Sequence, residues 1–185
     1  GDADVQPFAT SYGGVVNSGT GIDTLTINGG SVVVTGLTTP PVQGTPFDLD
    51  PSAGVISMGD GDDIVIMRGG AIGTTAAPLG LDLGAGADRF TMSGGTISGS
   101  VFGLGGGNTY TVSGGRIDGS IFAGSQDDTV NISGAAFIHG NFDIGPDAVG
   151  LEDGDDTFTM TGGTLVGAVS GGNGDDLIFI SGGSV

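Results

Sequence analysis

The sequence contains no cysteine, no lysine and only three arginines, Arg68, Arg89 and Arg116. The absence of cysteine excludes disulfides, thiolate zinc sites and thiol catalysis. Twenty-one acidic residues give a net charge of −18, so the chain cannot neutralise phosphates, which excludes nucleic acid and disfavours an anionic membrane surface. Cations and cationic partners remain as binding classes.

The sequence also lacks an apolar run of about 18 residues that could span a membrane, and it does not open on a signal peptide. It ends at Gly182-Gly183-Ser184-Val185, in the middle of a repeat. We therefore expect a piece of a longer chain that does not itself insert into a membrane.

Glycine is abundant, with 42 residues, while hydrophobic residues make up 37% of the chain. That apolar content argues against a disordered chain. Glycine at this density predicts a turn that recurs many times.

An internal repeat accounts for this composition. Each unit begins with an anchor, usually Asp, and continues with alternating apolar residues and a Gly-Gly turn, as in Asp88-Arg-Phe-Thr-Met-Ser-Gly-Gly-Thr-Ile97. The anchors are Asp23, Asp63, Asp88, Asn108, Asp128, Asp156 and Asp176. Their spacings are 40, 25, 20, 20, 28 and 20 residues, so the basic repeat has 20 residues.

Alternation predicts a strand with one buried face in each unit, since the residues two and four after the anchor are apolar and those between are mostly Thr. A unit this short buries its apolar face only by stacking on its neighbours. The sequence therefore predicts an all-β, right-handed parallel β-helix of about seven to eight coils. A single sheet or sandwich is the alternative, but it does not explain the constant period.

We expect residues 1–185 to form one solenoid unit, with an N-terminal extension or cap at about 1–13 and insertions at about 36–53, 74–78 and 145–152. The spacing of 40 leaves two interpretations of the first insertion, a degenerate coil or a protruding loop, and its prolines favour the loop. Ile64/Ile66 and Leu177/Phe179 are apolar at outward positions, which predicts a cover or a partner there.

Acidic glycine-rich turns precede three anchors and are candidates for weak Ca²⁺ binding. One of them, Gly171-Gly-Asn-Gly-Asp-Asp-Leu-Ile-Phe179, fits the nonapeptide of calcium-binding β-rolls. Their oxygens suit a hard cation, although only one copy occurs per coil. The alternative, which we favour here, is that each Asp accepts hydrogen bonds from its own turn. The candidate ligands are Asp60, Asp62, Asp63, Asp153, Asp155, Asp156, Asp175 and Asp176.

The sequence shows no pattern that predicts catalysis. The sole histidine, His139, lies in a degenerate repeat, and the three arginines stand at different repeat positions. A polysaccharide-active enzyme needs clustered groups in a cleft. We therefore expect no enzyme, no required cofactor and no catalytic residues.

Units such as Asp153-Gly-Asp-Asp-Thr-Phe-Thr-Met-Thr-Gly-Gly-Thr-Leu165 resemble the passenger-domain repeats of bacterial autotransporters (type V secretion). The resemblance covers the chain from Asp23 onward and implies a β-helix displayed at the bacterial surface or secreted. It also implies adhesion, self-association or binding to a host cell-surface or matrix protein. A secreted, calcium-binding β-roll is the alternative, and a glycan-active β-helix enzyme is the second alternative.

Overall fold

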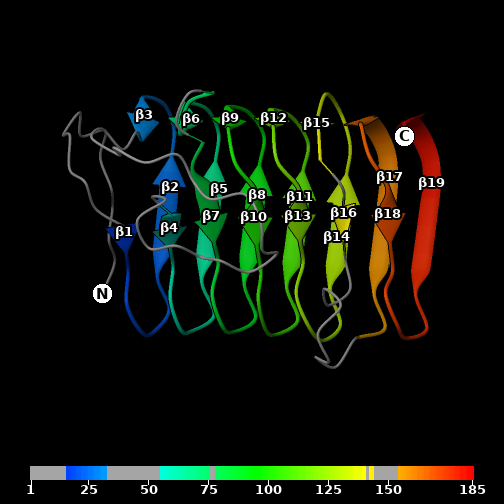
Figure 1. The fold of residues 1–185 in the computed structure, drawn as a ribbon, viewed down its shortest axis with the longest axis horizontal. Helices are drawn as coiled ribbons and strands as arrows, with labels where there is room; N and C mark the ends of the chain where they lie inside the picture. Colours follow the sequence, from blue (N-terminus) through cyan, green and yellow to red (C-terminus); the bar gives the residue numbers. More distant parts are fainter. Residues whose placement is uncertain (1–15, 33–54, 76–77, 141, 144–153) are drawn as a thin grey trace.

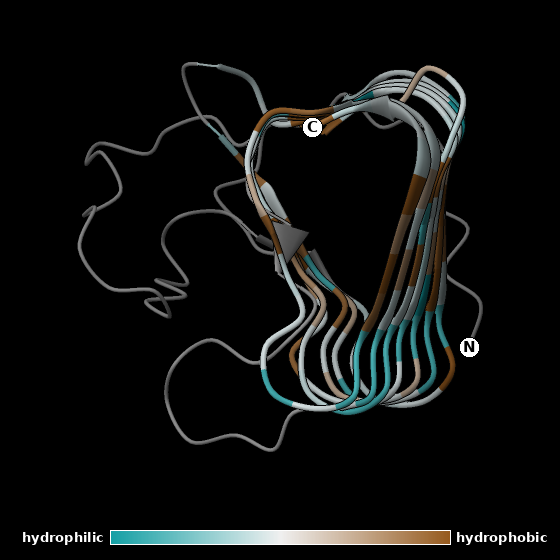
Figure 2. Ribbon diagram, turned by 90° about the vertical axis from the view of Figure 1, so that its right-hand side faces the viewer, coloured by the Kyte–Doolittle hydropathy of each residue, from teal (hydrophilic) through white to brown (hydrophobic). Residues whose placement is uncertain are grey.

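The computed structural model describes residues 16–32, 55–75, 78–140, 142–143 and 154–185. They form strands that wind into a parallel β-solenoid, with three strands in a typical coil and neighbouring coils stacked side by side (Figure 1). Seen along the stack, each coil encloses a core between three faces (Figure 2). Within the described residues no helix is long and apolar enough to cross a membrane. The predicted all-β parallel solenoid is confirmed.

The long face contains the strands that follow the anchors. In stacking order these are β2 (Thr24–Ile27), β5 (Ile64–Met67), β8 (Arg89–Met92), β11 (Thr109–Val112), β14 (Thr129–Ile132), β17 (Thr157–Leu165) and β19 (Leu177–Ser184). Every pair is parallel, and equivalent residues face one another, as Tyr110 does Val130. The observed register therefore reproduces the spacing of the anchors.

The second face continues the same sheet through the bend of β17. Its strands are β3 (Ser31–Val32), β6 (Ala71–Ile72), β9 (Thr96–Ile97), β12 (Arg116–Ile117) and β15 (Phe137–Ile138). The third face is a separate sheet of β1 (Val16–Asn17), β4 (Val55–Ser57), β7 (Gly80–Asp82), β10 (Val101–Phe102), β13 (Ile121–Phe122), β16 (Phe142–Asp143) and β18 (Val169–Ser170).

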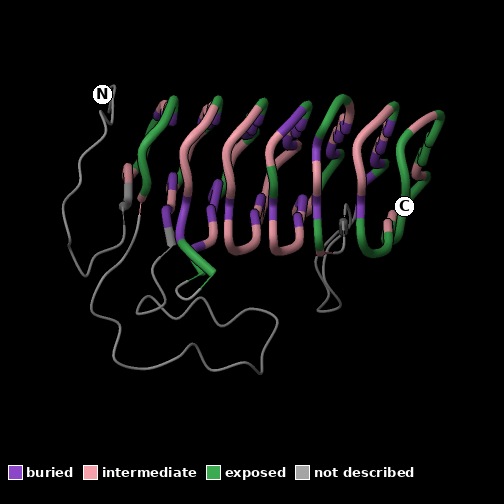
Figure 3. Tube along the Cα trace, turned by 90° about the horizontal axis from the view of Figure 1, so that it is seen from above, coloured by how far each residue is buried: buried purple, intermediate pink, exposed green. Residues whose placement is uncertain are grey.

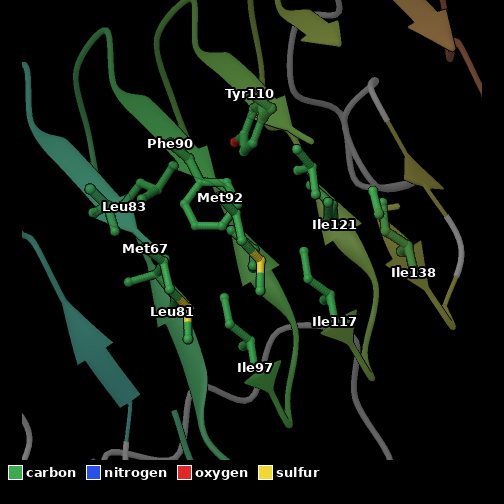
Figure 4. Close-up of a cluster of buried hydrophobic side chains, with 14 of the residues drawn as sticks. Met67, Leu81, Leu83, Phe90, Met92, Ile97, Tyr110, Ile117, Ile121 and Ile138 are labelled. Carbon is green, nitrogen blue, oxygen red and sulfur yellow. The ribbon is translucent and has the colours of Figure 1, made fainter. Parts of the chain in front are cut away.

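The core is a set of side-chain columns that run the length of the stack (Figure 4). Val65, Phe90 and Tyr110 of the long face are fully buried, while the Thr residues that alternate with such inward residues along the strands, as Thr91 and Thr111 do, are half-buried. Burial of each large apolar side chain stabilises the fold by about 2 kcal/mol. The two inward positions were thus predicted correctly in every unit except the last, that of β19 (Leu177–Ser184), where both are exposed.

Glycine is required where the turns stack most closely. Gly84 has a φ of +94°, and a Cβ on it would lie 1.7 Å from the carbonyl oxygen of Gly59 in the preceding coil. Gly59 has the same φ and approaches the carbonyl oxygen of Gly19 in the same way. A side chain here would push neighbouring coils apart, which explains why the turns are rich in glycine.

The first insertion does not add a coil to the stack. Thr24 pairs directly with Ile64, and Ser31 with Ala71, so no degenerate coil lies between these two units. Most of the inserted segments, and the expected cap at 1–13, lie outside the described residues.

The apolar outward residues behave differently at the two places. Ile64 and Ile66 are half-buried, like the Thr residues of neighbouring coils. On β19, the outward Leu177 and Phe179 and the inward Ile178 and Ile180 are all exposed. Figure 3 shows this exposure at the C-terminal coil. The residues that the structure describes place nothing over this coil.

Candidate functional site

The anchors form a column along one edge of the solenoid, where the turn enters the long face. Figure 2 shows these hydrophilic turns stacked along the lower edge. We call the seven anchors, Asp23, Asp63, Asp88, Asn108, Asp128, Asp156 and Asp176, the anchor column. All are buried except Asp176, which is half-buried in the last coil. A buried row of carboxyl groups is costly unless something compensates its charge.

One side-chain oxygen of every anchor after Asp23 is satisfied by the neighbouring coil. The backbone N–H of each anchor from Asp23 to Asp156 donates to Oδ1 of the next anchor along the stack, at 2.6–3.0 Å. The expectation that each Asp bonds within its own turn is wrong for these contacts. The stacked coils bring the next anchor's Oδ1 within hydrogen-bond distance of that N–H, so the ladder connects coils.

The second carboxylate oxygen has no such partner in four anchors. Oδ2 of Asp23, Asp63, Asp88 and Asp128 is buried and accepts no hydrogen bond. Burial raises the pKa of Asp63, and it raises that of Asp88 to about 7 and that of Asp128 to about 8, against the opposing effect of the N–H bond. These oxygens need either a proton or a cation.

Asn108 shows what that second position accepts. Its Oδ1 takes the ladder bond from Asp88 N–H, and its Nδ2 donates to the carbonyl oxygens of Ala123 at 2.9 Å and Gly103 at 3.4 Å. The inside of this turn therefore presents acceptor oxygens to the anchor side chain. An ionised Asp in the same place adds another acceptor, and a cation bound by carboxylate and carbonyl oxygens would balance it.

A second acidic column lies one residue before the anchors and faces solvent. The Oδ1 atoms of Asp62, Asp127 and Asp155 each accept from a backbone N–H of the following coil at 2.9 Å. This ladder runs in the opposite direction to that of the anchors. Asp175 is exposed at the end of the same column.

The eight candidate ligands thus divide between positions rather than forming one centre. Asp63, Asp156 and Asp176 belong to the anchor column, and Asp62, Asp155 and Asp175 to the exposed column. Asp60 is exposed on an isolated bridge beside Thr20 and Ala85, and Asp153 lies outside the described residues. Among those residues no group of three or more His, Cys, Asp or Glu is arranged to hold a metal ion. Backbone carbonyls would have to complete any cation site.

Three anchors with this environment were not named as ligands from the sequence, namely Asp23, Asp88 and Asp128. The calcium prediction rested on turns with several acidic residues. In the structure, the carboxyl groups that lack a partner are instead those of buried anchors. The anchor spacing itself was the signal that could have identified them.

The basic and aromatic residues of the second face form a surface cluster. Arg116 pairs with Asp118 and lies 4.6 Å from the centroid of the Phe137 ring, on which His139 also stacks. Arg68 instead donates to Asn28 at 3.3 Å. His139 is exposed on this face, and these contacts hold it among surface side chains, away from the anchor column.

Comparison with known proteins supports the fold class. No protein-family model and no curated protein sequence matches the chain. Among solved structures, the chain is similar to the crystal structure of a hyperactive, Ca²⁺-dependent, β-helical antifreeze protein from an Antarctic bacterium. The TM-score is 0.62 and the identity 20%, and the match covers 92% of this chain and 44% of that one. The likeness shows a β-solenoid fold, and the resemblance to autotransporter passengers stays a prediction.

Proposed function

We propose that this chain is a calcium-stabilised, extracellular β-solenoid module without catalytic activity. The observation that carries the proposal is the row of buried Oδ2 atoms in the anchor column that have no hydrogen-bond partner. Divalent cations held by these oxygens and by turn carbonyls would neutralise charge that the fold otherwise buries. Calcium dependence of the antifreeze protein with a similar fold is consistent with this assignment.

Calcium suits an extracellular setting because modules with weak sites fill only where the ion is abundant, at about 10⁻⁴–10⁻³ M. A cation that binds the folded chain but not the unfolded one stabilises it in proportion to the logarithm of its concentration. The module would then become rigid after export, and its carboxylates would serve the scaffold rather than catalysis.

Thermal unfolding followed by circular dichroism tests this function. We expect the transition temperature at about pH 8 to rise on titration of CaCl₂ into EDTA-treated protein, and much less with MgCl₂ at equal ionic strength. Isothermal titration calorimetry on the same samples reports the number of ions. An unchanged transition temperature together with no binding heat would refute the proposal.

A second candidate is display of a binding surface for a host protein or another copy of the chain. The observation that favours it is that Ile66, Asn131 and Phe179 interrupt an outward column of the long face that otherwise consists of Thr. A surface that differs between coils suits recognition of a particular macromolecule better than a repeating lattice such as ice. Immobilised full chain assayed against extracellular-matrix proteins tests this candidate, with a thermal-hysteresis assay as the comparison.

A further inference from the structure

One coil differs from the two coils beside it at three inward positions at once. It has Asn108 where they have an Asp anchor, Tyr110 where they have Phe90 and Val130, and Gly103 where they have Leu83 and Ala123 five residues before the anchor. Tyr110 is fully buried, and Figure 4 shows it beside Phe90 in the core.

The polar atoms of these residues converge on one carbonyl. Asn108 Nδ2 donates to Ala123 O at 2.9 Å, and the Tyr110 hydroxyl donates to the same oxygen at 3.0 Å. A Cβ on Gly103 would lie 2.0 Å from Ala123 O, 2.1 Å from the Tyr110 oxygen and 2.7 Å from Asn108 Nδ2. Glycine at this position therefore makes room for both donors.

The side-chain arm that carries Nδ2 in Asn108 carries Oδ2 in an Asp anchor. In the last coil, a Cβ on Gly171 would lie 2.4 Å from Oδ2 of Asp176, so that arm again reaches the residue five positions before its anchor. The two coils share a geometry but differ in chemistry. Where Asp presents an acceptor to other acceptors, Asn108 and Tyr110 present two donors, and the protein itself satisfies the carbonyls.

We infer that Gly103, Asn108 and Tyr110 form a built-in substitute for a cation, which interrupts the row of calcium sites and divides it into two segments. The inference rests on the proposed function, because it assumes that cations bind the Asp anchors. One segment contains Asp23, Asp63 and Asp88, and the other contains Asp128, Asp156 and Asp176. The interruption spans two coil intervals, or about 10 Å at the usual strand separation, so repulsion between the innermost ions of the two segments is weakened.

The interruption also gives the central coils a source of order that does not depend on calcium. Hydrogen bonds from Asn108 and Tyr110 connect the coil of β11 to the turn of the next coil. In the absence of calcium, Asp63, Asp88 and Asp128 of the two outer segments carry buried carboxylates whose Oδ2 accepts no hydrogen bond, while the coil of Asn108 buries no such charge. We therefore expect the ends of the solenoid to open before its centre.

The test converts the interruption into an Asp coil. The double variant Asn108→Asp/Tyr110→Phe removes both donors and restores the anchor carboxylate. Measured by calorimetry in calcium, its stoichiometry should increase by about one ion per chain relative to the unmodified protein. Its transition temperature should fall in EDTA and recover in calcium. Asn131→Asp is the matched control, because it adds the same charge to the outward side of β14 and should leave the stoichiometry unchanged.

The outcomes separate the inference from the proposed function. The inference is refuted, and the proposed function stands, if the unmodified chain binds calcium but the double variant binds no additional ion. The double variant must then also gain no more calcium-dependent stability than Asn131→Asp does. If neither chain binds calcium, the proposed function is refuted first. If the double variant does not fold in EDTA, hydrogen exchange of the unmodified chain in EDTA tests the inference instead. Backbone amides that are most protected in β8, β11 and β14 agree with the inference, and a uniform loss of amide protection contradicts it.

Discussion

Without calcium, the protein should become less stable as the pH rises from about 5.5 to about 8.5. Burial raises the pKa of Asp88 to about 7 and that of Asp128 to about 8, whereas both carboxyl groups titrate at about 3.9 in an unfolded chain. Between these values the folded protein binds protons that the unfolded chain does not. The contribution of these two carboxyl groups to the free energy of unfolding is therefore fully present below about pH 4. It is lost as the pH rises through their folded-state pKa values.

The size of the effect follows from the same values. Treated as independent groups, Asp88 contributes about 2 kcal/mol and Asp128 about 3 kcal/mol across this pH interval. Nearby solvent at this edge screens the charges, so we expect a total of about 2 to 3 kcal/mol. For a chain of this length that corresponds to a fall of about 5–10 °C in the transition temperature.

Differential scanning calorimetry in EDTA measures this change directly. The double variant Asp88→Asn/Asp128→Asn is the control, because Asn resembles a protonated Asp and already occupies the column at Asn108. We expect its transition temperature to vary much less with pH. In saturating calcium the unmodified protein should also lose most of its pH dependence. A transition temperature in EDTA that is constant or rises with pH would refute the reasoning.

Three further predictions concern single positions. Gly84→Ala should destabilise the fold by more than about 3 kcal/mol in chemical denaturation, because its Cβ would lie 1.7 Å from a carbonyl oxygen and its φ is +94°. The control variant Gly105→Ala should cost much less, since the nearest atom to its Cβ would lie 3.8 Å away. Asp128→Asn should raise the transition temperature in EDTA at about pH 8 and reduce the gain from calcium, since it removes a buried charge. Asp127→Asn, on the exposed column, should change neither the transition temperature in EDTA nor the gain from calcium. Differential scanning calorimetry of both variants makes the comparison. Phe179→Thr should reduce self-association in sedimentation velocity, because it removes an exposed aromatic ring from the last strand.

The sequence predicts the stacking because a solenoid repeats the same local pattern in every coil. Phe90 and Met92 alternate with polar residues, and both are fully buried. Their burial needs only strand geometry and a neighbouring coil, which the period supplies. The longest spacing keeps the same register, because Thr24 pairs directly with Ile64 and no coil lies between them.

The hydrogen-bond partners of the anchors could not be predicted in the same way. In the sequence, Asp88 is closest to the atoms of its own turn, and an Asx turn is the usual expectation. In the solenoid, the N–H of the preceding coil, 25 residues away, lies 2.8 Å from its Oδ1. The difference arises because stacking sets the distance between coils, and no local pattern encodes which neighbour a side chain reaches.

Tyr110 illustrates a further limit. In the repeat it is one more large residue in a buried column of aromatic and aliphatic side chains. Its hydroxyl acquires a role only because Gly103 lets Ala123 O approach it. A partner that depends on the absence of a Cβ in the turn after another strand is visible in the structure but not in the spacing of the repeat.

Asn108 also bears on why the other anchors are Asp. If the column served only to accept a backbone N–H, Asn would serve equally well, since Asn108 makes that bond at 2.9 Å with no charge to bury. Its second arm even gains partners in Gly103 and Ala123, whereas Oδ2 of Asp63 and Asp128 has none. Asp is therefore the less favourable residue for the ladder alone. It becomes the more favourable one when a cation is present, because only a carboxylate supplies both the ladder bond and a charged ligand.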